Sequence, residues 1–311
     1  MSAHSSKKVI FAALFGNFLI FLSKLAAALY TSSSAMFSEA IHSIVDCGNQ
    51  VLLLYGIKKS SRKADQYHPF GYGKELYFWS FCVAMMIFAV GAGISLYEGV
   101  HKILEPQEIS NIRVNYIVLG VALLFEAYPW KLAYDEFNQR RGKLKFFEAV
   151  QKSKDPSLFA ILFEDTAAML GLFAALIGLF LGDFFNIPEA DGFASVIIGI
   201  ILATTACVLA YECKGLLIGE AASSDIVSSI RNLFQGNPAI INVNEILTMH
   251  MGPNDVLLNL SLDFRDDITA GEVERTISEN EIKIKKLHPR IRRIFIEVQS
   301  RQGHIANQNL G

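Results

Sequence analysis

Six long apolar stretches fill the first two thirds of the chain. Each is close to the roughly 20 residues that a helix needs to cross a bilayer, and none alternates between apolar and polar residues as a barrel strand would. The pattern therefore predicts six membrane-spanning helices. The expected spans are Val9–Tyr30, Ala35–Ile57, Leu76–Tyr97, Val114–Leu132, Leu158–Leu181 and Ala190–Tyr211.

After residue 213 the pattern changes to mixed charged and apolar residues. Helical spacing of apolar residues, or alternation at period two, predicts five short elements, and Thr269 with Glu272 has the spacing of a helix capping box. We expect a membrane domain over residues 1–213, a small α+β domain over 214–300 and a polar, frayed tail over 301–311. The five elements are a helix at Ser223–Phe234, strands at Val243–Met251 and Val256–Phe264, a helix at Thr269–Leu287 and a strand at Arg293–Gln299.

Composition supports an integral membrane protein, because 52% of the 311 residues are hydrophobic and only 19% are charged. The net charge of −2 gives no indication of a nucleic-acid partner. The four cysteines form no CxxC pair, so reduced structural thiols are expected. We find no zinc-protease, Walker or nucleophile-elbow motif, and we therefore predict neither an enzyme nor an ATP-driven pump.

Basic residues predict the orientation. They gather before the first span and in the second and fourth connections, whereas the other connections hold few or none. The positive-inside rule then places both termini in the cytoplasm, at the plasma (inner) membrane if the protein is bacterial. The basic residues are Lys7, Lys8, Lys58, Lys59, Arg62, Lys63, Lys74, Lys131, Arg140, Arg141, Lys143, Lys145, Lys152 and Lys154, against Lys102 and Arg113 on the other side.

The second span contains an unusual polar stretch, Ser38–Asn49. His42 and Asp46 are four residues apart, so they share one face of a helix, and Glu39 lies near the same stripe. A charged side chain near the bilayer centre costs at least about 2.5 kcal/mol, so it tends to face the protein interior and to mark an ion path. Imidazole and carboxylate are also zinc ligands. The alternative is a hydrogen bond that joins two helices.

A second acidic pair, Glu164 and Asp165, lies in the fifth span. If the second and fifth spans pack together, His42, Asp46 and Asp165 supply three ligands to a divalent cation. The fourth is then Glu164, Glu39, Asn49 or a water molecule. This ligand set favours Zn²⁺ and leaves Mn²⁺, Fe²⁺ and Co²⁺ open. In the alternative interpretation, Lys24 of the first span binds the acid pair.

The chain resembles the cation diffusion facilitator family, over about residues 8 to 300. The resemblance rests on His42-x-x-x-Asp46, on the acids of the fifth span, on the loop His68-Pro69-Phe70-Gly71-Tyr72-Gly73-Lys74 and on Leu216-Leu217-Ile218-Gly219-Glu220. It implies six spans, a cytosolic domain of ferredoxin-like fold and a homodimer. It also implies export of a divalent metal from the cytosol in exchange for protons, with no tightly bound cofactor.

The family's transport site has two positions on each of two spans. They match His42, Asp46, Ile161 and Asp165 here, so an apolar Ile161 stands where members with the common pattern have His or Asp. The Glu-Asp pair is similar to the branch of mitochondrial zinc exporters. Either Glu164 replaces the missing ligand, or three protein ligands suffice.

At two further metal sites of the family, the residues of this chain match the ligand pattern only in part. In the loop after the second span, Asp65 and His68 match two ligand positions, but Tyr72 is a poor zinc ligand, so we expect that site to be weak or absent and His68 to hydrogen-bond locally. We expect a solvated strand edge rather than metal at the residues that fall near the family's bridging sites, which are His250, Asp263, Glu297 and Gln299. We also expect Pro129, close to Glu126, to interrupt the fourth span.

These features predict a proton-coupled antiporter for a divalent metal, with zinc as the cargo and metal ions, protons, lipid and a second copy of the chain as partners. Metal binding needs a neutral imidazole and ionised carboxylates, so it releases protons, and rocking helices provide alternating access. Three alternatives stay open: a membrane-anchored metal sensor or interaction protein that does not transport, an exporter of another divalent cation (Mn, Co or Fe), and an exporter of an organic cation.

Overall fold

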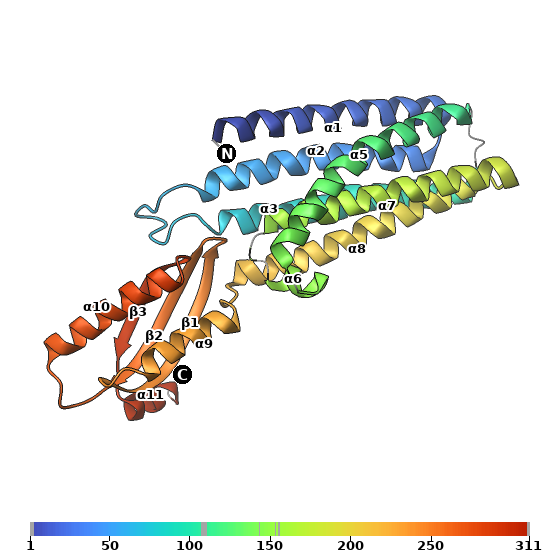
Figure 1. Ribbon diagram of the computed structural model, residues 1–311. Helices are drawn as coiled ribbons and strands as arrows, with labels where there is room; N and C mark the ends of the chain where they lie inside the picture. The colour runs from blue at the N-terminus through green and yellow to red at the C-terminus, as the bar shows by residue number, and fades with distance from the viewer. Residues whose placement is uncertain (1–2, 107–110, 143, 153, 155, 310–311) are drawn as a thin grey trace. The chain divides into compact units, whose positions relative to one another are not determined.

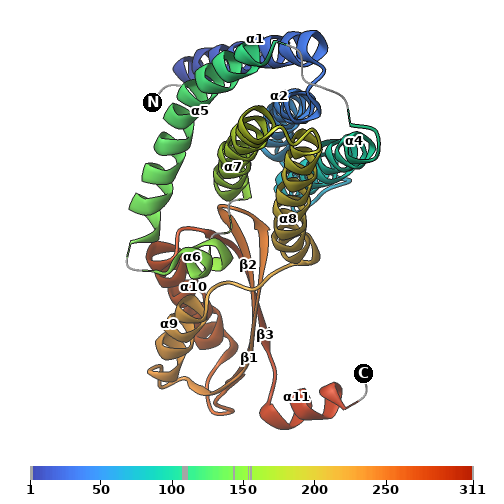
Figure 2. The same cartoon turned by 90° about the vertical axis from the view of Figure 1, so that its right-hand side faces the viewer.

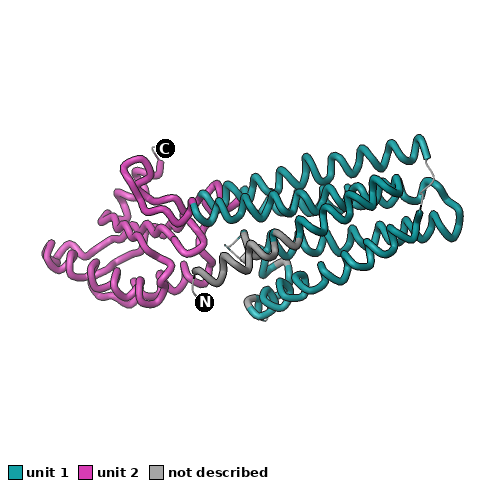
Figure 3. The backbone as a smooth tube through the Cα atoms, turned by 90° about the horizontal axis from the view of Figure 1, so that it is seen from above, with its two compact units in different colours: residues 1–58, 75–214 teal, residues 59–74, 215–311 magenta. Residues whose placement is uncertain are grey.

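A computed structural model describes residues 3–106, 111–142, 144–152, 154 and 156–309. The chain forms two compact units, shown in Figure 3. The first contains residues 1–58 and 75–214. The second contains residues 215–311 together with the connection 59–74. That connection joins two helices of the first unit, yet its contacts group it with the C-terminal part of the chain.

The first unit is helical (Figure 1). Four helical stretches in its described part are long and apolar enough to cross a membrane: Glu75–Leu104, Ile112–Gln139, Phe159–Phe185 and Ala190–Ile218. The full list of elements is α1 (Ala3–Thr31), α2 (Ser34–Ser60), α3 (Glu75–Met86), the π-helical segment η1 (Ile87–Ala92), α4 (Gly93–Leu104), α5 (Ile112–Arg141), α6 (Phe146–Lys152), α7 (Pro156–Phe185) and α8 (Ala190–Ile218).

The first two expected spans form helices of 29 and 27 residues, α1 and α2. At 1.5 Å per residue each is long enough to cross a bilayer. In the described part of α1, however, the apolar helical run is the shorter segment Asn17–Thr31, and α2 carries the polar stretch that lowers its hydropathy. Four stretches are therefore long and apolar enough to cross a membrane, and six spans remain a prediction.

Two details of the first unit differ from the sequence-based expectation. Helix α5 continues through Pro129 instead of ending there. A proline removes one backbone hydrogen bond, and membrane helices tolerate this where neighbouring helices support them; α5 packs against α1 and α7. The short helix α6 was not expected, because seven residues are too few for an apolar period to stand out.

The elements of the second unit follow the predicted order α-β-β-α-β and end with one helix that was not expected. They are α9 (Ser224–Gln235), β1 (Ile240–Gly252), β2 (Asp255–Phe264), α10 (Ala270–Leu287), β3 (Ile291–Val298) and α11 (Arg301–Gln308). The strands form one sheet in the order β1-β2-β3. The tight β1–β2 connection makes an antiparallel pair, and the α10 crossover makes β2 and β3 parallel. The more specific ferredoxin-like assignment remains a prediction.

Alternation along β2 positions the core of this unit. Val256, Leu258, Leu260 and Leu262 are buried, and α9 and α10 cover one face of the sheet (Figure 2). The predicted capping box at the start of α10 is present, because Thr269 and Glu272 exchange hydrogen bonds. The tail was wrongly expected to be frayed.

That tail forms α11 because the Ser300 hydroxyl caps the helix by accepting a hydrogen bond from the N–H of Gly303, at 3.2 Å.

Candidate metal site in the membrane helices

Helix α2 presents His42 and Asp46 on one face, one turn apart, as their spacing predicts. His42 Nδ1 lies 3.5 Å from Asp46 Oδ1. The His42 side chain is buried, and that of Asp46 is 19% exposed. An imidazole and a carboxylate therefore meet inside the helical unit, within reach of a shared ion.

Helix α7 turns Glu164, rather than residue 161, toward α2. The Asn49 side-chain amide donates a hydrogen bond of 2.8 Å to Glu164 Oε1, and both side chains are buried. Ile161, at the family's ligand position, is 44% exposed. Asp165, one residue further on, is half-buried. Glu164 lies three residues after Ile161, about 60° away around the helix, and of the two only Glu164 is buried.

Several buried polar atoms of this region have no hydrogen-bond partner among the described residues. They are both ring nitrogens of His42, Asp46 Oδ1, Asn49 Oδ1 and Asp165 Oδ2. Buried polar atoms in proteins are nearly always paired, and exceptions call for an explanation. All of these atoms except a protonated ring nitrogen can offer a lone pair to a metal ion. The donor types thus fit a divalent cation, as the sequence predicts.

The predicted ligands do not, however, close around one point. In the part of the chain that the structure describes, no group of three or more His, Cys, Asp or Glu side chains is close enough to hold a metal ion. The structure instead shows two pairs, His42 with Asp46 and Asn49 with Glu164. Their convergence on one ion stays a prediction.

Glu39, one of the candidates for the fourth ligand, belongs to a separate cluster. The Lys24 ammonium lies 3.0 Å from Glu39 Oε2, 3.0 Å from Ser43 Oγ and 2.9 Å from Glu126 Oε1. Lys24 thus pairs with acids of the helical unit, but its partners among the described residues are these and not the Glu164–Asp165 pair named in the alternative interpretation. No pattern in the sequence indicates that α5 contributes Glu126 to this cluster.

The loop site at Asp65 and His68 is organised by hydrogen bonds. Asp65 Oδ2 accepts the Tyr72 hydroxyl at 2.6 Å, and Asp65 Oδ1 accepts the backbone N–H groups of Tyr67 and His68 at 3.0 and 2.8 Å. The hydroxyl bond above all, and then the backbone bonds, hold the pKa of the Asp65 carboxyl below its ordinary value. This carboxylate fixes the loop that contains the His-Pro-Phe-Gly-Tyr-Gly motif.

The candidate residues of the C-terminal unit do not all lie at a solvated edge. His250 is only 3% exposed, which corrects that expectation: it lies near the end of β1, where its backbone N–H also binds the carbonyl of Glu220. Asp263 accepts the N–H of Arg301 at the start of α11. Glu297 is exposed on β3, as expected for an edge strand.

Sequence reasoning missed the residue that fixes the start of α2. Asp191, on α8, is 1% exposed, and its carboxylate accepts the Ser33 hydroxyl at 2.5 Å and the Ser34 backbone N–H at 2.6 Å. An acid in the first turn of α8 looks like a cap for its own helix, so nothing in the sequence points to α2.

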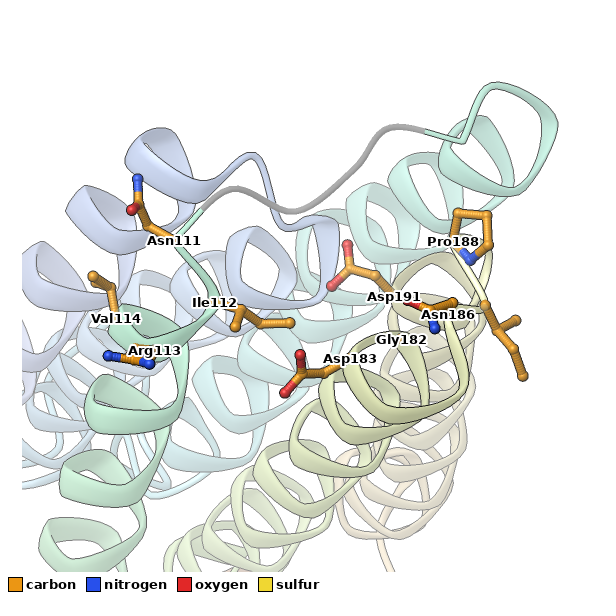
Figure 4. Close-up of a pocket in the computed structure, with 10 residues that line it drawn as sticks. Asn111, Ile112, Arg113, Val114, Gly182, Asp183, Asn186, Pro188 and Asp191 are labelled. Atoms are coloured by element: carbon orange, nitrogen blue, oxygen red, sulfur yellow. The ribbon is translucent and has the colours of Figure 1, made fainter.

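Next to Asp191, a cavity of about 730 Å³ lies between the start of α5 and the α7–α8 turn (Figure 4). Asp183 and Asp191 are among its lining residues.

Comparison with known proteins finds similarity to proteins named for the transport or tolerance of metal cations. Residues 10–218 match the sequence profile of the cation efflux transmembrane domain. The mitochondrial proton-coupled zinc antiporter SLC30A9 of Xenopus laevis is 35% identical over 83% of this chain and 46% of its own length. Metal tolerance protein C4 of Arabidopsis thaliana is 27% identical over 83% and 57%. The manganese efflux system protein MneP of Bacillus subtilis is 24% identical over 89% and 91%. The chain spans about half the length of the SLC30A9 relatives it matches.

Proposed function

Because this chain belongs to the cation efflux family, we propose that it exports a divalent metal ion, with zinc as the cargo, in exchange for protons. The single observation that carries the proposal is a set of buried side-chain atoms on α2 and α7, at His42, Asp46, Asn49 and Asp165, that have no hydrogen-bond partner within the described part of the chain. The relatives add support, since one is named a proton-coupled zinc antiporter and another a manganese efflux protein.

In this proposal His42 and Asp46 bind the metal from α2, and Asp165 and Glu164 bind it from α7. A small movement of α7 toward α2 closes the set, since Asn49 already connects Glu164 to α2. Metal enters when the imidazole is neutral and the carboxylates are ionised, and protons load the site after the metal leaves. Rocking of the helices exposes the site to one side of the membrane at a time. Both termini face the cytoplasm, and the chain works as a homodimer.

The test is flux into reconstituted vesicles across a panel of Zn²⁺, Mn²⁺, Co²⁺ and Fe²⁺, with and without a pH gradient. Asp46→Ala and Asp165→Ala abolish flux while size-exclusion profiles stay unchanged. Asp135→Ala is the matched control, because Asp135 is an exposed acid on α5 and its loss leaves flux intact. Full flux in both site variants would refute the assignment, and flux that ignores the pH gradient would refute proton coupling.

Two further variants decide which residue of α7 is the fourth ligand. Glu164 is 6% exposed and bonded to α2, whereas Ile161 is 44% exposed. Glu164→Ala therefore weakens zinc binding by at least tenfold. Ile161→His, added to that variant, does not restore binding, because position 161 is 44% exposed whereas Glu164 is buried and bonded to Asn49 of α2. Restoration by Ile161→His would show that position 161 reaches the site.

A metal sensor is the second candidate. It is favoured by the absence, among the described residues, of three potential ligands grouped around one point. A sensor binds zinc in equilibrium dialysis and changes its protease sensitivity, but it moves no zinc into vesicles. The flux measurement above separates the two functions directly.

A further inference from the structure

The Lys24 ammonium is buried in the helical unit and has a complete set of hydrogen-bond acceptors. Its side chain is 0% exposed, and its nitrogen has three oxygen partners at 2.9–3.0 Å, one each from Glu39, Ser43 and Glu126. An ammonium group has three N–H donors, so all of them are used. The oxygens come from two helices, α2 and α5, while the ammonium reaches them from α1.

The same pocket contains more acceptor capacity than the ammonium uses. Glu39 is 0% exposed, and its second oxygen, Oε1, has no hydrogen-bond partner among the described residues. That oxygen lies against Gly171 of α7, where any side chain would overlap it. Two carboxyl groups and a hydroxyl thus surround one monovalent group. Taking an ammonium out of water costs several kcal/mol, and this oxygen cage offsets that cost.

Helix α2 places this pocket beside the proposed transport site. Glu39 and Ser43 are four residues apart and share one face; His42 and Asp46 are also four apart and share the neighbouring face. At 100° per residue the midpoints of the two pairs lie about 60° apart around the helix, so the two faces adjoin. One face points to the Lys24 ammonium and the other carries the candidate metal ligands.

We propose that the Lys24 ammonium is a tethered cation that fills a second cation pocket, built by Glu39, Ser43 and Glu126. In this way a single face of α2, that of His42 and Asp46, is left for the transported metal. The inference rests on the proposed function only for the role of that second face. The pocket itself is defined by the contacts of Lys24.

The chemistry of the pocket predicts which ion would replace the ammonium. All of its ligands are oxygens, from two carboxyl groups and one hydroxyl. Such sites prefer hard cations such as Mg²⁺, Ca²⁺ and Mn²⁺, whereas the imidazole of His42 suits Zn²⁺. Lys24→Met keeps most of the aliphatic stem and removes the charge, so the variant gains a Mn²⁺ site that the native protein closes.

The experiment counts Mn²⁺ bound to the purified full-length chain, by equilibrium dialysis with the free ion measured by electron paramagnetic resonance. Lys24→Met binds one more Mn²⁺ per chain than the native protein. Adding Glu39→Gln and Glu126→Gln to that variant removes the extra ion. Lys102→Met is the matched control: Lys102 is also buried, but its ammonium donates to the backbone carbonyl of Ser32, and its loss adds no ion.

Added Mn²⁺ provides a control for the possibility that Lys24→Met fails to fold. If Lys24→Met aggregates in the absence of metal, purification in millimolar Mn²⁺ recovers a monodisperse protein, and the same treatment does not recover the variant that also lacks both carboxylates. A Lys24→Met protein that binds no additional Mn²⁺, or that Mn²⁺ fails to recover, would overturn the proposal.

The two proposals fail separately. In a chain with Asp46→Ala and Asp165→Ala the transport site is removed, yet Lys24→Met still adds one Mn²⁺ if the pocket exists. A wrong transport site shows as unchanged zinc flux in the parent double variant, and a wrong second pocket shows as an unchanged Mn²⁺ count after Lys24→Met.

Discussion

Gly171 of α7 lies so close to Glu39 that a single added methyl group tests the contact between them. A Cβ at this residue would overlap Glu39 Oε1, and it would also lie 3.5 Å from Glu39 Cδ and 3.8 Å from Ile198 Cγ1. Glu39 cannot simply retreat, because its other oxygen is bound to the Lys24 ammonium at 3.0 Å. Gly171→Ala therefore forces either α7 or the Glu39–Lys24 pair to move.

The expected magnitude is the difference between two opposing terms. Alanine is more favourable than glycine in a helix interior by about 0.5–1 kcal/mol. Overpacking a well-filled site costs about 1–3 kcal/mol. The two terms differ by about 0–2.5 kcal/mol, and their midpoints by about 1 kcal/mol, so Gly171→Ala should destabilise the protein by about 1 kcal/mol. Gly120 of α5 supplies the control: within the described residues no heavy atom lies within 4 Å of a Cβ built there, so Gly120→Ala gains the helix term alone.

The assay is thermal unfolding of the purified protein in one detergent, followed by zinc flux in vesicles. We expect the melting temperature to fall in the order Gly120→Ala, native protein, Gly171→Ala. Flux should fall only for Gly171→Ala. If Gly171→Ala melts at as high a temperature as Gly120→Ala, then Glu39 does not lie against α7. In that case α7 does not help to enclose the oxygen atoms around Lys24.

Three further outcomes follow from single contacts. Asn49→Ala removes the donor to buried Glu164, costs about 1.5–3 kcal/mol if that carboxylate is ionised, and lowers the melting temperature; an unchanged value would contradict the contact. Asp191→Ala removes the cap of α2, costs about 0.5–2 kcal/mol, and speeds hydrogen exchange in the first turn of α2; unchanged exchange there would count against the cap. Hydrogen bonds from Thr269, its backbone N–H first, lower the pKa of Glu272, so its contribution is complete above the unfolded value of about 4.3 and disappears as pH falls through the lower folded value. Hydrogen exchange at the start of α10 should therefore be faster in Glu272→Gln than in the native protein at pH 7. The difference should disappear once the pH lies below the lowered folded pKa of Glu272, and a difference that persists there would exclude this carboxylate as its cause.

Local patterns predicted the C-terminal unit well because its elements are decided locally. The alternation from Val256 to Phe264 puts every second side chain on one face whatever the rest of the chain does, and the structure buries that face. The pair Thr269 and Glu272 likewise needs only three residues of helix to meet. Tertiary context entered at the tail, where Asp263 binds the N–H of Arg301.

The candidate site was predictable only in part, because its second half depends on how helices are rotated against each other. The spacing of His42 and Asp46 fixed their shared face, and the structure brings them to 3.5 Å. Spacing alone did not show that α7 turns Glu164 inward and Ile161 outward. Two adjacent acids on a helix give no local sign of which one faces inward; packing of the small residues around them decides it.

The same limit explains why the role of Lys24 was only half visible in the sequence. A lysine in an apolar stretch has to find an acid or reach water, and six acids lie within the other expected spans. In the structure Lys24 pairs with Glu39 and Glu126. These pairs change how the polar residues of α2 are interpreted. Its four positions Glu39, His42, Ser43 and Asp46 do not form one diffuse metal site. They form one face that a lysine already neutralises, and a second face whose lone pairs on His42 and Asp46 lack hydrogen-bond partners among the described residues. Only the second face still needs a cation, which is why we place the cargo there.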